Sequence, residues 1–251
     1  MRRIFLGSIL FCSLSTMACT VISNPVGTPG ELGNATFEYT LCVLDCGLDH
    51  AMMHGTEESI GATAKTMPAV TVTSTAPGVV TVIDATPTRT CCSSSATGSS
   101  CRSIQATESC NANETTGIAI DAIAAAPGSA EIVLTAGDGT VFDRIAVGVA
   151  DPASLEFSTY SSGLSIGTSY GAAWTARDES GAKLMSTSGV HLVTSDASVV
   201  DFKRTLLSSN SSSVDAEDVL FGTTYEPHAH GDATITATAQ SVTTSFQLHV
   251  N

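Results

Sequence analysis

The sequence predicts an all-β protein, in which two tandem β-sandwich domains follow a cleaved leader. Only 14% of the residues are charged, and the chain is rich in Val and Thr, which favour strands over helices. Alternating apolar and polar runs are separated by turn residues at intervals of about ten positions. Two pairs of similar passages recur about 100 residues apart, which is typical of a tandem of like domains.

The chain begins with a pattern typical of secretory signal peptides. Two arginines precede an apolar run over residues 4–14, which is too short to span a bilayer as a stable helix. The small residues that follow resemble the lipobox of bacterial lipoproteins. This resemblance implies cleavage after Ala18 and attachment of lipid, with palmitate as an acyl group, to Cys19. Thr16 stands where the lipobox usually has Leu, so plain secretory cleavage near Ala18 is the alternative.

The rest of the chain divides into a tether and two domains. Residues 1–18 are expected to form the signal peptide, and residues 19–33 the lipidated cysteine and a flexible tether rich in Pro and Gly. Residues 34–150 are expected to form a disulfide-containing sandwich and residues 151–251 a second sandwich. The boundary falls near Pro152, where proline interrupts a strand pattern.

Two repeated passages define the proposed duplication. Residues 73–80 resemble residues 194–200 if one residue of gap is allowed, and residues 128–136 resemble residues 231–239 without a gap. Each copy of the second passage is followed by a turn and another alternating run, which predicts a closing hairpin. Turn spacing and domains of about 100 residues favour immunoglobulin-like sandwiches, with Trp174 in the second core.

Charge restricts the partners of the protein. The chain has 24 acidic and 10 basic residues and a formal net charge of −14, which becomes more negative when the leader is lost. Such a surface repels nucleic acid and anionic lipid, so no nucleic-acid binding is expected. No later stretch approaches 18 apolar residues, and membrane attachment is therefore expected through lipid only.

Eight cysteines are present, of which Cys12 leaves with the leader and Cys19 is the expected lipid site. Six remain, and an even number in an exported protein predicts three disulfides. Fifteen pairings are possible for six cysteines, and the sequence does not choose among them. The adjacent Cys91 and Cys92 are expected to pair with different partners. The six residues are Cys42, Cys46, Cys91, Cys92, Cys101 and Cys110.

Several motifs resemble the bacterial Ig-like (BIG) domains of cell-surface proteins. They are Ser-Asp-Ala-x-Val-Val over residues 195–200, Gly-x-Ala-Thr-Ile-Thr-Ala-Thr over residues 231–238, and an Asp-x-x-Gly hairpin over residues 178–181. The resemblance covers the second domain well and the first less well, because residues 91–110 form an insertion. It implies an envelope lipoprotein with a role in adhesion, spacing or display, without catalytic residues or a cofactor.

Metal binding is the alternative function. Cys42, Cys46, His50 and His54 are spaced four apart, which on a helix would place them on one face as zinc ligands. Oxidation of the cysteines in an exported protein argues against this set, and we predict no metal site there. Met52 and Met53 beside the histidines raise copper binding as a further alternative, against which core packing is favoured.

A histidine pair and a Gly-x-Ser-x-Gly pattern are two further candidate functional sites. His228 and His230 alternate before a predicted strand, where a weak divalent-metal site competes with an ordinary surface loop. Gly-Thr-Ser-Tyr-Gly around Ser169 matches the nucleophile elbow of hydrolases, but that motif requires a following helix, and the residues after Ser169 alternate as a strand. We therefore predict that the protein is not an enzyme.

Together these observations predict a lipid-anchored, non-catalytic protein of the cell envelope. Its partners are expected to be the membrane, through the lipid, and an envelope protein or polysaccharide. Thr20 follows Cys19, in place of the Asp associated with inner-membrane retention, which favours the outer membrane or cell surface. An exported metal-binding protein that uses His50, His54, His228 or His230 is the alternative.

Overall fold

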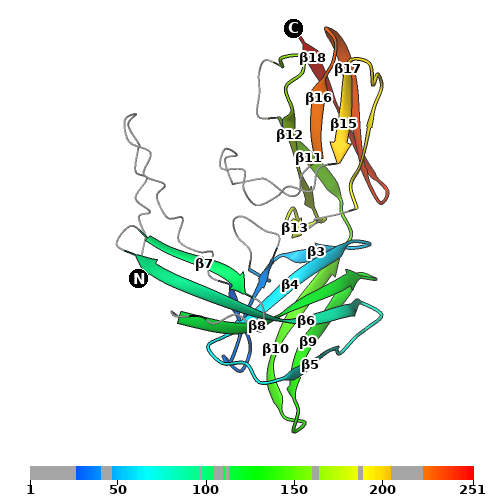
Figure 1. The fold of residues 1–251 in the computed structure, drawn as a ribbon. Helices are drawn as coiled ribbons and strands as arrows, with labels where there is room; N and C mark the ends of the chain where they lie inside the picture. Colours follow the sequence, from blue (N-terminus) through cyan, green and yellow to red (C-terminus); the bar gives the residue numbers. More distant parts are fainter. Residues whose placement is uncertain are drawn as a thin grey trace, which may run out of the picture.

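All described residues of the protein lie in strands, turns and irregular segments, without a helix (Figure 1). The computed structural model describes residues 27–40, 47–95, 98–104, 110, 113–159, 164–185, 189–204 and 223–251. The predicted all-β class is therefore confirmed. Within these ranges no helix is long and apolar enough to cross a membrane.

The N-terminal half of the chain forms a sandwich of two sheets. One sheet has the strand order β1-β2-β4-β8-β6-β7, and the other contains β5, β9, β10 and β3. The bounds are β1 (Thr28–Pro29), β2 (Thr36–Tyr39), β3 (Ala51–Met53), β4 (Glu57–Ala64), β5 (Val70–Ser74), β6 (Val80–Ser95), β7 (Gly98–Ile104), β8 (Asn113–Ala124), β9 (Gly128–Ala136) and β10 (Val141–Ala150).

The C-terminal half forms a second sandwich. One layer contains β15, β16, β12, β11 and β13, and the other is the sheet β14-β17-β18. The bounds are β11 (Ser154–Thr159), β12 (Tyr170–Arg177), β13 (Lys183–Met185), β14 (His191–Thr194), β15 (Val200–Arg204), β16 (Thr223–Pro227), β17 (Gly231–Ala239) and β18 (Val242–Val250).

Both sandwiches have the strand order of a constant-type immunoglobulin domain. If seven strands are lettered A to G along the chain, that fold pairs A-B-E-D in one sheet and C-F-G in the other. The first sandwich has β2-β4-β8-β6 and β5-β9-β10, and the second has β11-β12-β16-β15 and β14-β17-β18. Strands β1, β3, β7 and β13 are additions to this pattern. The predicted pair of Ig-like sandwiches is thus present.

Equivalent hydrogen bonds confirm that the repeated passages occupy the same place in both sandwiches. The backbone N–H of Thr75 donates to Glu131 at 3.0 Å, and that of Ser195 donates to Thr234 at 2.9 Å. In return, the N–H groups of Glu131 and Thr234 donate to the side-chain hydroxyls of Thr75 and Ser195, both at 2.9 Å. This register aligns the two passages without the one-residue gap that the sequences suggested.

The closing hairpins lie where the sequence places them. In β9 and β17 every second residue is buried, as expected for strands with one face in a core. Gly139 turns the first hairpin with a φ of 86°, and Gln240 turns the second with a φ of 54°. Trp174 is 3% exposed and belongs to the second core, as predicted.

A shared sheet joins the two sandwiches. Strand β13 of the second sandwich pairs in parallel with β3 of the first, with Leu184 opposite Ala51 and Met185 opposite Met52. Met185 is 1% exposed and belongs to the hydrophobic core of the first sandwich. Burial of such a side chain is worth about 1.5–3 kcal/mol. We refer to this contact between β3 and β13 as the joint.

Part of the expected tether is folded onto the first sandwich. Strand β1 pairs with β2, and the N–H of Glu31 donates to the carbonyl of Arg144 at 2.9 Å. The guanidinium of Arg144 also lies 2.7 Å from the Glu31 carboxylate. The sandwich therefore accepts hydrogen bonds from the backbone N–H groups of Gly30, Glu31 and Leu32. The remainder of the expected tether and the leader lie outside the described residues.

Strands β6, β7 and the start of β8 extend beyond the first sandwich as an arm (Figure 1). Within the insertion, pairing continues along β6 and β7 as far as Ser95 opposite Gly98. Among the described side chains of β6, Val80, Val82 and Ala85 reach the core, and none after Ala85 belongs to it. The arm thus adds length to the sheet, and its described side chains do not extend the core.

Candidate functional site

The joint contains a histidine that contacts three separate segments. The backbone N–H of His54, directly after β3, donates to Ala150 at 2.9 Å. Its ring Nδ1 lies 2.7 Å from Oδ1 of Asp151, and Nε2 lies 3.1 Å from the carbonyl oxygen of Ala125. Its own carbonyl accepts a hydrogen bond of 2.6 Å from Nε2 of Gln240 in the second sandwich. His54 therefore connects both sandwiches and the segment between them.

Two residues with left-handed backbone conformations allow this close approach. Gly55 has a φ of 81°, and a Cβ at this position would overlap Nε2 of Gln240. Gln240 itself has a φ of 54°, which is uncommon for a residue with a side chain and places it at the tip of the β17–β18 hairpin. Both features are local to the joint.

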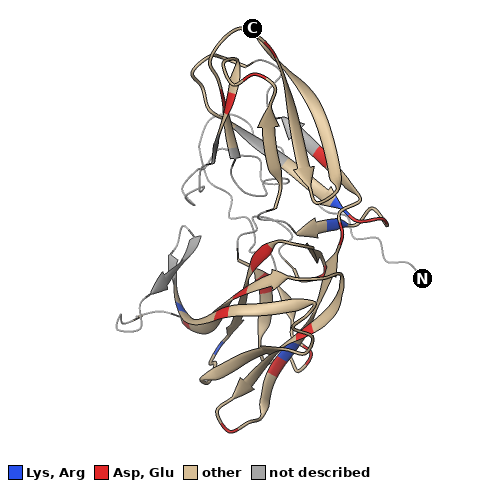
Figure 2. Cartoon of the chain, turned by 90° about the vertical axis from the view of Figure 1, so that its right-hand side faces the viewer, with Lys and Arg blue, Asp and Glu red and all other residues tan. Residues whose placement is uncertain are grey.

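A cleft of about 760 Å³ lies beside the joint, between the two sandwiches. Three carboxylates line it, and none of its lining residues is Lys or Arg, so the cleft favours cationic groups over anionic ones. Figure 2 shows that acidic residues also outnumber basic ones over both sandwiches. The lining residues are His54, Pro127, Val149, Ala150, Asp151, Pro152, Ala153, Asp178, Glu179, Ser180, Gln240 and Ser241.

Asp178 shapes one wall of the cleft through the turn between β12 and β13. Its Oδ1 accepts hydrogen bonds from the Ser180 hydroxyl at 2.7 Å and from the backbone N–H groups of Ser180 and Ala182, each at 2.9 Å. The Ser180 hydroxyl is the main cause that lowers the pKa of Asp178, and the backbone groups add to it. The predicted Asp-x-x-Gly hairpin is therefore confirmed, with Gly181 at a φ of 82°.

The histidines considered as metal ligands do not form a metal site in the described part of the chain. No group of three or more His, Cys, Asp or Glu side chains there could hold a metal ion. His50 and His54 flank β3 rather than lying on a helix, while His228 and His230 are exposed between β16 and β17. Cys42 and Cys46 lie outside the described residues, so the complete zinc set is not seen.

The methionines beside His54 pack in the hydrophobic cores, which was the favoured alternative to copper binding. Met52 and Met53 lie in β3 and are 0% and 1% exposed. Met52 belongs to the first hydrophobic core, and Met53 belongs to a cluster shared with Leu184 at the joint. Alternate strand residues point to opposite faces, and here a sandwich core covers each face.

Ser169 lacks the surroundings of a hydrolase nucleophile. It is exposed and lies directly before β12, so a strand follows it where a nucleophile elbow requires a helix. The neighbouring Tyr170 accepts a hydrogen bond of 2.7 Å from the backbone of Ser165 and stacks on Tyr225 at 5.6 Å between ring centroids. This motif therefore has a packing role.

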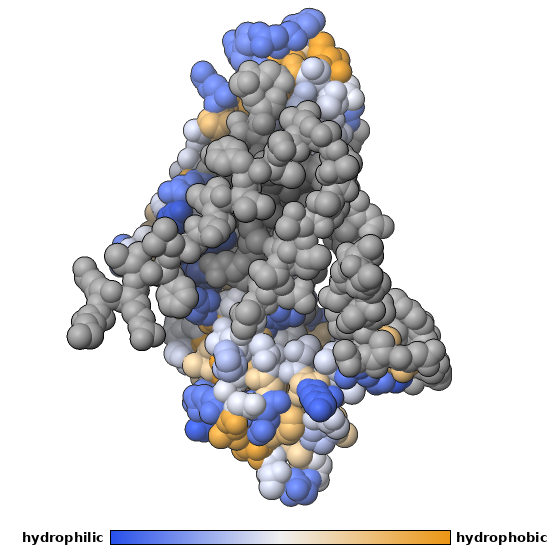
Figure 3. All heavy atoms as spheres, turned by 90° about the vertical axis from the view of Figure 1, so that its left-hand side faces the viewer, coloured by the Kyte–Doolittle hydropathy of each residue, from blue (hydrophilic) through white to orange (hydrophobic). Residues whose placement is uncertain are grey.

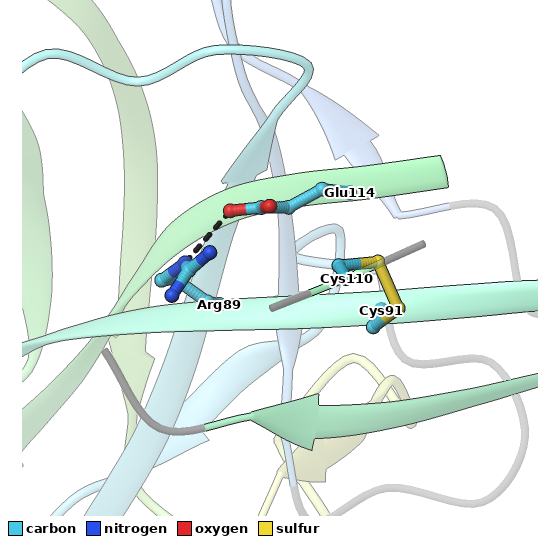
Figure 4. The surroundings of a disulfide bond; sticks show 4 residues. All are labelled: Arg89, Cys91, Cys110 and Glu114. Carbon is cyan, nitrogen blue, oxygen red and sulfur yellow. Dashed lines mark hydrogen bonds and ion pairs between the residues drawn. A yellow bond between two sulfur atoms is a disulfide. The ribbon is translucent and has the colours of Figure 1, made fainter. Parts of the chain in front are cut away.

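One predicted disulfide is present in the arm. Cys91 in β6 is bonded to Cys110, and their Cα atoms are 5.6 Å apart. Beside this bond, Arg89 and Glu114 form an ion pair of 2.7 Å between β6 and β8 (Figure 4). The Arg89 hydrogen bond lowers the pKa of Glu114.

The other cysteines are only partly described. The backbones of Cys92 and Cys101 lie opposite each other in the β6–β7 ladder. Cys19, Cys42 and Cys46 lie outside the described residues. The lipid site and the other disulfide pairings therefore remain predictions.

The sequence did not indicate the contacts that build the joint. Asp151 lies beside the predicted domain boundary and Gln240 in the predicted closing turn, and each acquires its partner by long-range packing. His54 was considered as a metal ligand, whereas it binds a carboxylate and a carbonyl. An exposed Asp232–His249 contact of 2.6 Å was also not anticipated.

Comparison with known proteins yields structural likeness only. No family model matches the chain, and no curated protein matches it. Domains 5–6 of the S-layer protein SbsC are 15% identical, with 80% of this chain and 92% of that chain covered at a TM-score of 0.28. The adhesin InvE of Yersinia pseudotuberculosis is 15% identical, with 87% and 59% covered at a TM-score of 0.30.

A β-glycosidase of Bacteroides vulgatus matches to a similar degree. It is 9% identical, with 86% of this chain and 24% of that chain covered at a TM-score of 0.30. At such TM-scores the superpositions are partial. The immunoglobulin-like assignment therefore stands on the strand order of the two sandwiches.

Proposed function

We propose that this protein is an exported, lipid-anchored envelope protein with a non-catalytic structural or adhesive role. Its two sandwiches would act as a spacer that holds a binding surface away from the membrane. Cleavage after Ala18 and lipidation of Cys19 would leave a short tether, since residues 27–33 are already folded onto the first sandwich. Residues up to 150 and from 151 on would form the two domains.

The joint is the observation that carries the proposed spacer. A flexible linker would let the second domain reorient freely relative to the first. A strand pair and a shared core between the domains oppose such motion. Here β13 continues the sheet of the first sandwich, and Met185 fills its core. Gln240 adds a hydrogen bond of 2.6 Å to His54. The two domains are thus suited to transmit position and force as one body.

Export is supported by the chemistry of the arm. The Cys91–Cys110 bond is a disulfide, and such bonds persist in oxidising compartments outside the cytoplasm. The leader-like first residues agree with this location. Among the possible membranes, we favour the outer membrane or the cell surface.

The surface suits an uncharged or cationic partner of the envelope, such as a protein or polysaccharide. With a net charge of −14 it repels nucleic acid. On the face shown in Figure 3, apolar and hydrophilic residues of the described part are mixed, and apolar groups appear near both ends of the molecule. A catalytic role would require an assembled set of nucleophile and base, and Ser169 does not provide one.

The proposal is tested by the intact mass of the protein extracted from its native membranes without reducing agent. A chain that starts at Cys19 and carries added acyl mass is the expected result. Protease treatment of whole cells would then show whether the sandwiches face the exterior. An unmodified chain in the soluble fraction would contradict the anchor, and cytoplasmic location with free thiols would contradict export.

A further inference from the structure

The two sandwiches present the same short segment beside their last strands. In the first sandwich it comprises residues 52–55, and in the second it comprises residues 164–167, which we call the distal edge. Each segment lies parallel to the last strand of its own sandwich, β10 or β18. In both sandwiches it follows strand A and switches the chain to the opposite sheet.

Hydrogen bonds match these segments residue by residue. The N–H of Gly55 donates to Ala124 at 2.8 Å, and that of Gly167 donates to Pro227 at 2.8 Å. The two glycines have φ values of 81° and 76°. The next residue is threonine in both copies, and its N–H donates to the carbonyl three positions earlier, at 3.2 and 3.3 Å. The distal edge therefore repeats the backbone of the segment at the joint.

In the first copy this segment is covered by another Ig-like module. The hairpin strand β13 pairs with β3 in parallel and buries Leu184 and Met185. Gln240 lies so close to Gly55 that a Cβ on the glycine would overlap it. The joint thus shows, within this molecule, what such a segment binds.

In the second copy no other described strand covers the equivalent segment. A Cβ on Gly167 would meet no atom within 4 Å. Ile166, at the position that corresponds to His54, is an apolar side chain that is 44% exposed. Among the described residues, Leu164 is bridged to Val250 only, so no strand is seen on its other side.

We propose that the distal edge is a docking site for a partner protein, which adds a hairpin strand to it in parallel, as β13 does at the joint. An unpaired edge offers backbone N–H and C=O groups to an incoming strand, and apolar pockets give it specificity. The partner would be a β-sandwich protein whose hairpin carries two consecutive apolar residues, like Leu184 and Met185. This inference goes beyond the proposed function and does not depend on the lipid anchor.

A second copy of this chain does not fit as the partner. Its β12–β13 hairpin already occupies its own joint. Its first sandwich has only irregular residues 65–69 between β4 and β5, where the second sandwich has the hairpin strand. Because neither sandwich offers a free equivalent hairpin among the described residues, we assign the docked strand to another polypeptide.

The test is an NMR titration of the ¹⁵N-labelled chain from residue 20 onward with a synthetic peptide of residues 176–185. This peptide contains the Asp178 turn, whose hydrogen bonds favour the hairpin in isolation. We expect saturable shifts of the amide signals of residues 164–168. The Ile166→Asp variant should bind the peptide about tenfold more weakly or not at all, because a buried apolar anchor is lost.

Matched controls distinguish binding at the distal edge from nonspecific hydrophobic binding of the peptide. The Ile83→Asp variant removes an apolar side chain that is 50% exposed in the first sandwich, and it should bind like the wild type. A peptide with Leu184→Ser and Met185→Ser should not bind. Absence of saturable shifts, or shifts confined to β3, would overturn the proposal. Concentration-dependent shifts at the distal edge without peptide would assign the site to a second copy and overturn the choice of partner.

Discussion

The carboxylate of Asp143 occupies the space that a side chain on Gly30 would need. A Cβ built on Gly30 would overlap Cγ of Asp143, which is fully buried in β10. The two carboxylate oxygens accept four backbone hydrogen bonds of 2.7–2.9 Å. The donors are the N–H groups of Leu32, Asn34, Ala35 and Arg144. This pair therefore fixes the N-terminal segment to the first sandwich.

Replacement of Asp143 by alanine should destabilise the first sandwich strongly. Buried N–H groups would lose their acceptor, and we expect the free energy of unfolding to fall by roughly 2–4 kcal/mol. Chemical denaturation followed by fluorescence or circular dichroism measures this loss. The Asp138→Ala variant, in an exposed turn, should cost clearly less, because solvent screens its hydrogen bonds. Equal losses for the two variants would contradict the role assigned to Asp143.

Substitution of Gly30 by alanine should also destabilise the protein, through overlap with the same carboxylate. Overpacking of this kind costs roughly 1–3 kcal/mol. Gly137→Ala is the matched control, because a Cβ at Gly137 would meet nothing within 4 Å. Thermal unfolding should show a lower Tm for Gly30→Ala only. An unchanged Tm would show that the N-terminal segment adapts without cost.

The Met185→Asp variant should uncouple the two sandwiches. It places a charge in the first core and opposes the β3–β13 pair, so the variant is expected to unfold in two calorimetric transitions where the wild type unfolds in one. Small-angle scattering should show a broader distribution of dimensions for the variant. Val193→Asp, at a side chain that is 51% exposed, should leave both measurements unchanged. Two transitions in the wild type would contradict a rigid joint.

Alkaline pH should destabilise the second sandwich through Tyr225. Burial raises the pKa of its phenol to about 12, because the charged form is disfavoured in the core. The stabilising contribution of the neutral phenol is complete below the unfolded pKa near 10 and is lost as the pH rises to about 12.

The Tyr225→Phe variant tests this pH dependence. The phenol oxygen is buried without a hydrogen-bond partner, so the variant should be as stable as the wild type, or more so, at pH 7. Between pH 10 and 12 it should lose roughly 2 kcal/mol less than the wild type. Unfolding curves across this range provide the comparison, and parallel losses in the two proteins would contradict the assignment.

Removal of the disulfide in the arm should act locally. In the Cys91→Ser and Cys110→Ser double variant, amide exchange should accelerate in β6 and β7, because an isolated ribbon of strands is only marginally stable. The main unfolding transition should move little, since the arm adds no described side chain to the core beyond Ala85. A large fall in Tm would show that the arm and the sandwich unfold together.

Local patterns were sufficient to predict much of the fold. The closing hairpins follow from alternation and from turn residues such as Gly139, and burial in β9 and β17 has the expected period of two. Trp174 lies in the second core, within a run of mostly small and apolar residues. The duplicated passages predicted the tandem organisation. The one-residue gap in their alignment was wrong, because equivalent hydrogen bonds of the two sandwiches align them without it.

The long-range contacts could not be predicted in the same way. Gly30 and Asp143 are far apart in sequence, and each is an ordinary residue in its local context. The pairing of β3 with β13 involves two short strands, neither of which has a periodic pattern long enough to detect. The sequence marks residues 91–110 only as an insertion, whereas the β6–β7 ladder continues from the paired strands before it.

The second sandwich carries both halves of a joint, namely the hairpin that docks and the distal edge that matches the segment on which it docks. In evolutionary terms this makes the module self-compatible. Each additional duplication of its coding segment would add one sandwich to the chain, and the new sandwich could dock through the same kind of joint. The first sandwich lacks the hairpin strand and could only begin such an array. A protein of this design can thus change its reach by copy number alone.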